Sequence, residues 1–265
     1  MEYLYFYEKF KILKITFLGT GTSQGIPVIS SKHPVCLSKD KRDKRLRVSI
    51  LIEWDDFAYV IDCGPDFRYQ MLRANVQKID GVLFTHEHAD HTAGLDDLRP
   101  FSFQLGAVPI YAQERVLENL AYRFDYIFNE KNKYPGAPSV QQNKVFNTQF
   151  YLKNLKITPI EVQHGALTIL GYAFNNVAYL TDVKKISESE KEKLKNLDIL
   201  IVNAIRYKAH HSHLNLEEAL ELVEELKPKK TYFTHISHHL GFHAVVEKTL
   251  PKNVFIAYDE LVIEI

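Results

Sequence analysis

The chain has 265 residues, of which 46% are hydrophobic and 25% are charged, and these values are typical of a soluble globular protein. Lys plus Arg and Asp plus Glu both number 33, so no net charge favours a nucleic-acid or anionic-membrane partner. Only two cysteines are present, Cys36 and Cys63, which excludes a disulfide scaffold and favours the reducing cytoplasm.

The first residues, 1–13, are aromatic but interrupted by charges, so they lack the continuous apolar core of a signal peptide or membrane helix. We expect them to form an N-terminal extension, either an added edge strand or a packed arm. No linker, repeat or low-complexity segment follows, so residues 1–265 are expected to form a single domain.

Alternating apolar runs bounded by Gly, Asp and Pro predict strands along the rest of the chain. In chain order these runs are "KITFLG", "RVSILIEW", "AYVIDCG", "GVLFTH", "PIYA", "LKITPIEV", "LGYAFNN", "VAYLTDV", "ILIVNAI", "KTYFTHI" and "NVFIAYDELVIEI". Helical periodicity is found in "PDFRYQMLRANV", "ERVLENLAYRFDYIF", "SESEKEKLKNL" and "NLEEALELVEELK". The strands come in two batches, each followed by helices. This order predicts an α/β fold, a four-layer αββα sandwich of two mixed β-sheets.

Three segments have more than one interpretation. Residues 129–143 lack clear periodicity and are expected to form a loop that could cover a site. The segment "KDKRDKRLR" (39–47) has six basic residues and is expected to be a solvated loop, with steering of an anionic substrate as the alternative. Aromatic residues between 122 and 134 could line a pocket, but their helical spacing favours a place in the core.

Nearly all of the twelve histidines fall behind predicted strands, where loops collect at one edge of a sheet. The densest group is "FTHEHADH", which follows the buried run "IDGVLF". His86 and His88 are two residues apart in an extended segment, so both rings can point the same way. Asp90 and His91 follow as the chain turns into a helix. Two pairs of imidazole and carboxylate ligands from one turn suit two neighbouring metal ions.

"THEHADHTAGLDDLRP" resembles the HxHxDH signature of the metallo-β-lactamase superfamily, and the remaining motifs of that family occur in order. They are Asp62 in "VIDCGPD", His164 in "VQHG", Asp182 in "YLTDV" and His235 in "FTHISH". The resemblance spans positions 15 to 265 and implies the metallo-β-lactamase fold.

The resemblance also implies a ligand set for two divalent ions, which could be zinc, manganese or iron. One ion would be held by His86, His88 and His164. The other would be held by Asp90, His91 and His235, with Asp182 bridging the two. Asp62 is expected to orient a ligand by accepting a hydrogen bond, with a simple strand-end turn as the alternative.

"FLGTGTSQGIPV" and "GLDDLRPF" look like the branch that contains tRNA 3′-processing endonucleases and a phosphoribosyl cyclic phosphate phosphodiesterase. In "HHSHLNLEEAL", His213 matches the histidine with which that branch assists phosphate-ester cleavage. An N-cap region with solvent-exposed imidazoles is the alternative, and it is more favoured for His210 than for His211. Arg99 and Asp96 of "GLDDLRP" could shape the pocket, or they could form an ion pair that supports the loop "FTHEHADH", which is called the metal loop below.

The relatives in this branch hold a second, structural zinc with a cysteine-rich segment after the "QGxP" turn. Here that segment is "VISSKHPVC", in which Ser31 and His33 replace cysteines while Cys36 remains. His33, Cys36 and the distant His238 would supply three ligands, but serine is a poor fourth. We expect this structural zinc to be lost.

The favoured function is a dinuclear metal-dependent hydrolase that cleaves a small cyclic or nucleotide-like phosphodiester by a metal-bound hydroxide, with Asp90, Asp182 and His213 as the catalytic residues. A thioesterase or lactonase of the same superfamily is one alternative, and a non-catalytic metal-stabilised binding protein is another. The expected partner is a small-molecule phosphodiester, with no membrane and no large nucleic acid, and the chain could form a homodimer.

Overall fold

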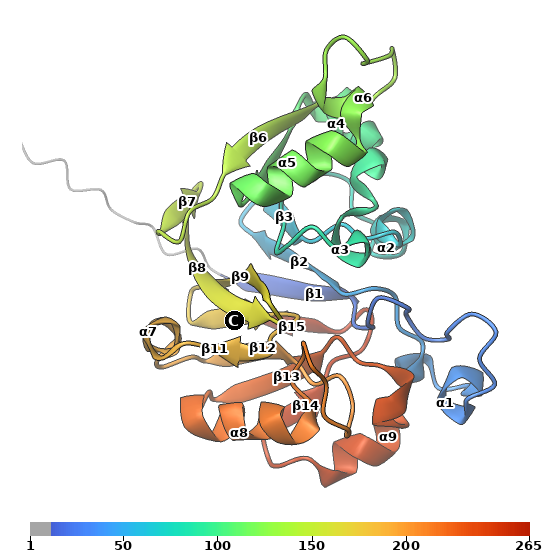
Figure 1. Cartoon of the computed structure of the whole chain (residues 1–265), viewed down its shortest axis with the longest axis vertical. Coiled ribbons are helices and arrows are strands. Elements are labelled where there is room, and N and C mark those ends of the chain that lie inside the picture. The colour runs from blue at the N-terminus through green and yellow to red at the C-terminus, as the bar shows by residue number, and fades with distance from the viewer. Residues whose placement is uncertain (1–11) are drawn as a thin grey trace, which may run out of the picture.

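Residues 12–265 are described by the computed structural model, so the expected N-terminal extension lies almost wholly outside the described residues. Two β-sheets pack face to face, and helices cover the outer face of each, as predicted (Figure 1). The first sheet has the order β15-β1-β2-β3-β4-β5-β6 and the second has β11-β8-β9-β10-β12-β13-β14, with β7 paired to β8.

The strands of the first sheet are β1 (Leu13–Gly19), β2 (Ser49–Trp54), β3 (Phe57–Ile61), β4 (Gly81–Leu83), β5 (Val108–Ala112), β6 (Val140–Lys144) and β15 (Val262–Glu264). The strands of the second are β7 (Phe150–Leu152), β8 (Leu155–His164), β9 (Leu167–Phe174), β10 (Val177–Leu180), β11 (Lys185–Ile186), β12 (Ile199–Asn203), β13 (Lys230–Thr234) and β14 (Val254–Ile256). Each sheet is mixed. Neighbouring strands are parallel from β3 to β6 in the first sheet and along the order β10-β12-β13-β14 in the second, and the other neighbours, including β11 and β8, are antiparallel.

Helices α2 to α6 lie against the first sheet, and α7 to α9 lie on the side of the second (Figure 1). Their bounds are α1 (Pro34–Leu37), α2 (Phe67–Arg73), α3 (Ala89–Thr92), α4 (Arg99–Leu105), α5 (Glu114–Arg123), α6 (Asp125–Phe128), α7 (Glu188–Lys191), α8 (Leu216–Leu226) and α9 (His243–Val246). The longest, α8, begins with a capping box in which Asn215 accepts from Glu218 N while the Glu218 side chain accepts from Asn215 N.

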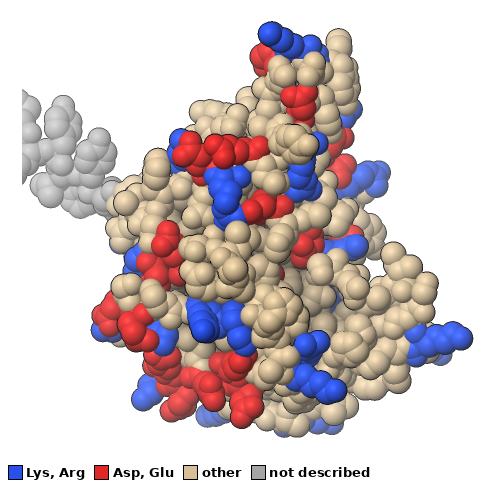
Figure 2. Space-filling view, in the orientation of Figure 1, with Lys and Arg blue, Asp and Glu red and all other residues tan. Residues whose placement is uncertain are grey.

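Three apolar layers hold the sandwich together. Ile15, Trp54 and Tyr172 belong to the layer between the sheets. Phe84 belongs to the layer under the helices of the first sheet, and Phe233 to the layer under those of the second. The burial of these side chains is the main stabilising term for a fold of this kind. On the face shown in Figure 2, acidic side chains gather in the region of α7 and α8, with lysines and arginines among and around them.

The C-terminal run 253–265 differs from the single strand that we predicted. It forms β14 in the second sheet and β15 in the first, because the chain crosses between the sheets at Asp259. Asp259 is buried there: its carboxylate accepts hydrogen bonds from Thr20 Oγ1 (2.7 Å) and Leu46 N (2.8 Å). The next residue, Glu260, has a left-handed φ of 71°, which turns the chain toward β1.

Other differences are local. The predicted helix over residues 114–128 breaks at Phe124 (φ −120°, ψ 45°), whose ring packs on the core of the first sheet. Residues 140–143 of the expected loop belong to edge strand β6, and the remainder extends beyond α6 (Figure 1). The prediction of a solvated loop at 39–47 is wrong for Arg45, which is buried and donates to Thr20 Oγ1 and to the Ala257 carbonyl. No helix within residues 12–265 has the length and apolar character to span a membrane.

We expect Asp259→Ala to lower the free energy of unfolding by about 3 kcal/mol, because it leaves the buried groups around Asp259 without their acceptor. Urea denaturation measures this change. Glu260→Ala is the matched control, since Glu260 lies 3.8 Å from the same Arg73 that approaches Asp259 but is exposed, and it should cost less than about 0.5 kcal/mol. Equal effects of the two variants would contradict this assignment.

Candidate metal centre

The predicted ligands meet at one edge of the sandwich. His86 follows β4, His164 ends β8, Asp182 follows β10 and His235 follows β13. These strands all point toward this edge, so their carboxyl ends bring the side chains together. The two sheets are tied to each other here, because Leu170 N donates to the Thr85 carbonyl and the Tyr172 hydroxyl donates to the Phe84 carbonyl.

The backbone is left-handed at three of the strand ends. The φ angle is 65° at Asp62, 60° at Asp182 and 53° at His235. This conformation is uncommon for residues with a Cβ atom, although aspartate and histidine adopt it more often than most, and it costs about 1 kcal/mol or more. It ends each strand abruptly and turns the next side chain along the edge of the sheet. Strain held at three converging residues is typical of a functional site.

The first ligand group consists of His86, His88 and His164, as predicted, and one ring nitrogen of each lies within 4.8 Å of the others. The Nε2 of His86 and the Nδ1 of His88 are 2.9 Å apart. His86 and His164 are buried, whereas His88 caps α3 and is exposed.

The second ligand group consists of Asp90, His91 and His235, also as predicted. The Nε2 of His91 lies 3.3 Å from Asp90 Oδ2, and the Nε2 of His235 lies 3.8 Å from the same oxygen. Both imidazoles are buried, and the Nε2 atom of each lies on the side of the Asp90 carboxylate.

Asp182 lies between the two groups. Its Oδ2 is 3.3 Å from His91 Nε2, and its Oδ1 is 3.3 Å from His235 Nε2 and 3.9 Å from His164 Nε2. Thr181 Oγ1 donates to Oδ2 at 2.6 Å and fixes the carboxylate. A carboxylate in this position can contact an ion in each group, which is the bridging role that the resemblance implies.

Hydrogen bonds to neighbouring groups orient the ligands. Asp62 is buried and contacts His91 Nδ1 at 2.7 Å, so the other nitrogen of that ring is directed toward the site. The amide of Thr85 donates to Asp62, which holds the carboxylate in place. His164 Nδ1 lies 3.0 Å from the carbonyl oxygen of Ser212. The predicted orienting role of Asp62 therefore has the geometry that it requires.

The charges in the site fit bound cations. Burial would raise the pKa of Asp182, but the imidazoles of His235 and His91 lower it well below its ordinary range. Burial would likewise lower the pKa of His91, but Asp90, Asp182 and Asp62 raise it well above the ordinary value. The buried Nε2 atoms of His91 and His235 have no hydrogen-bond partner within residues 12–265. Unpartnered imidazole nitrogens opposite carboxylates suit divalent metal ions.

His213 also reaches this edge, in the loop before α8. Its Nε2 is 2.8 Å from Asp182 Oδ1, and its Nδ1 is 3.0 Å from Ser212 Oγ and 3.1 Å from His210 Nδ1. His211, which we had favoured over His210 as a site residue, is exposed and stacks on the His210 ring. The chain bends at residues 211–213, and this bend places His210, not His211, against His213.

Sequence reasoning missed the groups that fix the metal loop to α5. Arg115 pairs with the Glu87 carboxylate, and Arg123 donates to the Glu87 carbonyl and to Thr92 Oγ1. Glu87 therefore anchors the loop and does more than space the ligands. One pattern in the sequence does indicate the supporting threonines: a threonine directly precedes His86, Asp182 and His235.

Arg99 and Asp96 form an ion pair at 2.7 Å. The Tyr126 hydroxyl donates to Asp96 at 2.8 Å, and Arg99 donates to the Tyr134 hydroxyl at 3.0 Å. Of our two interpretations, the ion pair is the one observed. Through Tyr134 it also holds the loop that follows α6.

The three candidate ligands of the structural zinc, His33, Cys36 and His238, do not come together as a metal-binding group. The ring centroids of His33 and His238 are 4.9 Å apart. Within residues 12–265, however, no group of three potential metal ligands includes either histidine or Cys36. The Cys36 thiol instead accepts from Val28 N, and His33 Nδ1 accepts from Val35 N. These two hydrogen bonds hold the loop together, and the loss of the structural zinc stays a prediction.

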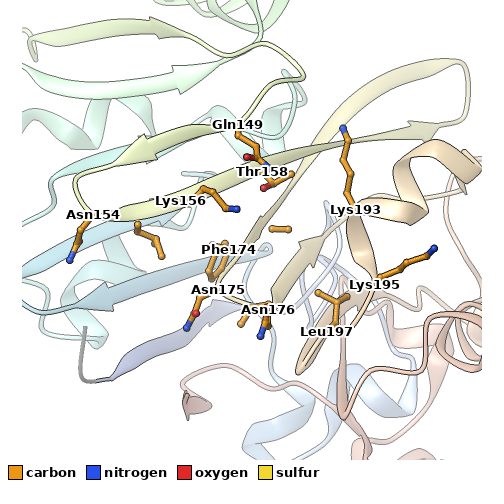
Figure 3. A pocket seen from close by; sticks show the side chains of 13 residues that line it. Gln149, Asn154, Lys156, Thr158, Phe174, Asn175, Asn176, Lys193, Lys195 and Leu197 are labelled. Atoms are coloured by element: carbon orange, nitrogen blue, oxygen red, sulfur yellow. The ribbon is translucent and has the colours of Figure 1, made fainter. Parts of the chain in front are cut away.

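A cavity of about 460 Å³ opens at the opposite edge of the second sheet, where β8, β10 and β12 begin (Figure 3). Lys156, Lys193 and Lys195 are among its lining residues, and the latter two pair with Glu190 and Glu192. None of the metal-ligand side chains lines it, so it is separate from the candidate metal centre.

Residues 58–236 match the family described as "Beta-lactamase superfamily domain". A solved structure of a diphosphatase from the PhnP family is 40% identical, with a TM-score of 0.91, and the match covers 97% of this chain and 98% of that one. An octanoyltransferase of Porphyromonas gingivalis is 39% identical over 94% of this chain but only 51% of its own length. A ribonuclease Z of Methanococcus maripaludis is 27% identical over 71% of this chain and 55% of its own length. The chain thus spans about half the length of these two curated relatives.

Asp62→Ala is expected to weaken metal binding by about 10- to 100-fold, because His91 would lose the group that orients it. The readout is the dissociation constant for Zn²⁺ in competition with a chromogenic chelator. Asp66→Ala provides a control in the same loop, since Asp66 pairs with Arg47 and touches no ligand. Metal affinity unchanged in Asp62→Ala would show that the contact does not support the site.

Proposed function

The chain belongs to the beta-lactamase superfamily and, within it, to the PhnP family, and we propose that it hydrolyses phosphoric diesters with two divalent metal ions. The observation that carries this proposal is the convergence of two ligand groups on Asp182. Histidine and carboxylate ligands without cysteine suit zinc, manganese or iron.

Two ions bound in these groups would lower the pKa of a water molecule and stabilise charge on a phosphoryl oxygen. Asp182 is positioned to hold the proton of an attacking water, because its carboxylate lies between the two groups. Asp90, whose side chain is only 13% exposed, completes the ligands that would fix the position of the phosphorus atom. Seven ligand side chains from both sheets hold this arrangement in place.

His213 is the proton donor that we assign to the leaving oxygen. Burial lowers its pKa to about 4, and the contact with Asp182 opposes that shift. An anionic phosphodiester beside the ring would stabilise the imidazolium and so raise this pKa on substrate binding. In the balanced reaction water adds to phosphorus, the bond to the leaving oxygen breaks, and that oxygen takes a proton from His213.

The proposed substrates include molecules that contain a diphosphate bridge. A phosphorus atom with two bridging oxygens and one negative charge occurs in a phosphodiester and also within a disubstituted diphosphate. The solved relative at 40% identity is described as a diphosphatase, which supports chemistry at such a centre. We therefore propose small phosphodiesters and disubstituted diphosphates as the substrates to test.

Hydrolysis of an acyl thioester is the second candidate. One observation favours it: the chain matches half of a protein named octanoyltransferase at 39% identity. The intact ligand groups argue against a third candidate, a binding protein without catalysis.

A substrate panel separates these candidates. The protein reconstituted with Zn²⁺, Mn²⁺ or Fe²⁺ is assayed on bis(4-nitrophenyl) phosphate, a cyclic nucleotide, a disubstituted diphosphate and an octanoyl thioester. We expect turnover of at least one phosphorus substrate that is abolished by a chelator. Turnover of the thioester alone would contradict the proposal and support the second candidate.

The role of His213 is tested by leaving-group dependence. His213→Ala should lower kcat about 100-fold or more on a cyclic nucleotide, whose alkoxide leaving group needs a proton. The loss should be much smaller on bis(4-nitrophenyl) phosphate, because nitrophenolate leaves without protonation. His211→Ala is the matched control and should retain activity on both. Equal losses on both substrates in His213→Ala would assign it a structural role instead.

A further inference from the structure

A second cavity, of about 340 Å³, has a different setting from the one in Figure 3. It is lined by Arg206, Tyr207, Lys208 and His239. Its volume is at the small end of the range for ligand pockets and suits one phosphate with part of an attached group.

Backbone hydrogen bonds place this cavity beside the candidate metal centre. Ile205, which directly precedes Arg206, donates its amide to the Leu214 carbonyl at 3.0 Å. Its carbonyl accepts from the Ser237 amide at 3.1 Å and from the Ser237 hydroxyl at 2.8 Å. Leu214 is the neighbour of His213, and Ser237 lies two residues after His235. One wall of the cavity therefore belongs to the loop that carries the proton donor, and the other follows a metal ligand.

The cavity carries positive charge that is not neutralised. Within residues 12–265, neither Arg206 nor Lys208 forms an ion pair with a carboxylate, whereas nearby Lys184 pairs with Glu218. Arg206 donates through Nε and Nη2 to the carbonyl oxygens of Lys208 (3.1 Å) and Ala209 (2.9 Å). These bonds fix the guanidinium in position without cancelling its charge, so it is preorganised for an anion.

The positive charge of the cavity also acts on two nearby histidines, His210 and His239. Burial lowers the pKa of His210, and the charge of Arg206 lowers it further. Burial also lowers the pKa of His239, and the charges of His33, Arg206 and Lys208 contribute in the same direction. Tyr207 adds a ring that is 53% exposed, on which a planar group could stack. No acidic side chain lines the cavity.

We propose that this cavity binds a second phosphate, carried by the leaving group of the substrate. We assign the second phosphate to the leaving group because Arg206, Tyr207 and Lys208 belong to the same loop as His213, the donor to the leaving oxygen. The inference rests on the proposed phosphodiesterase function and narrows its substrates to molecules with a further phosphate next to the reacting one, such as diphosphates and phosphorylated nucleotides.

The test uses AMP and ADP as competitive inhibitors of bis(4-nitrophenyl) phosphate hydrolysis by the metal-loaded protein. ADP offers a second phosphate where AMP has one. We expect ADP to inhibit about tenfold more tightly than AMP, and Lys208→Gln and Arg206→Gln each to remove most of that difference. Lys208 is exposed, so its variant tests the charge without disturbing the fold.

Lys229→Gln is the control, because Lys229 pairs with Asp198 outside the cavity, and it should keep the ratio of the two inhibition constants. A ratio near one in the wild type, or a ratio that neither cavity variant changes, would overturn the inference. The second result would also identify metal chelation as the source of tighter inhibition by ADP. Absence of any diester hydrolysis by the wild type would instead overturn the proposed function.

Discussion

Three carboxylates, Asp62, Asp90 and Asp182, face two buried imidazoles, His91 and His235, and the rest of the structure depends on balancing that charge. Desolvating carboxylates costs several kcal/mol for each unless they are paired or bound to a cation. Without a metal ion, a proton on His91 is the available compensation, and the neighbouring carboxylates hold its pKa high. Two divalent ions would compensate the same carboxylates more completely, which explains why both sheets deliver ligands to this edge.

The apolar layers beneath the site stabilise the fold and so offset the free-energy cost of burying these charges. Buried apolar side chains between the sheets and under the helices stabilise the strands whose ends are strained at Asp62, Asp182 and His235. Hydrogen bonds that cross between the sheets, such as the one from Tyr172 to the Phe84 carbonyl, keep the two ligand groups in register. The metal loop is further anchored from outside by the pair of Glu87 with Arg115.

The layered fold could be predicted from the sequence because period-two apolar runs mark the strands. The two ligand groups were implied by the resemblance to the metallo-β-lactamase motifs, whose residues follow directly behind those runs. What could not be predicted depends on contacts between distant residues. The turn at Asp259 that sends one apolar run into two sheets is set by Thr20 and Leu46, more than 200 positions away. Likewise, the place of Arg45 in the core follows from Ala257, and the choice of His210 over His211 follows from the path of a loop.

Metal stoichiometry tests most directly whether the convergent ligands form a dinuclear site. Metal-free protein is titrated with Zn²⁺, and bound metal per chain is measured by mass spectrometry beside turnover of bis(4-nitrophenyl) phosphate. Two ions per chain, with activity that rises to its maximum as the second ion binds, are the predicted result. Saturation at one ion or none, with activity already at its maximum or absent, would contradict a dinuclear centre.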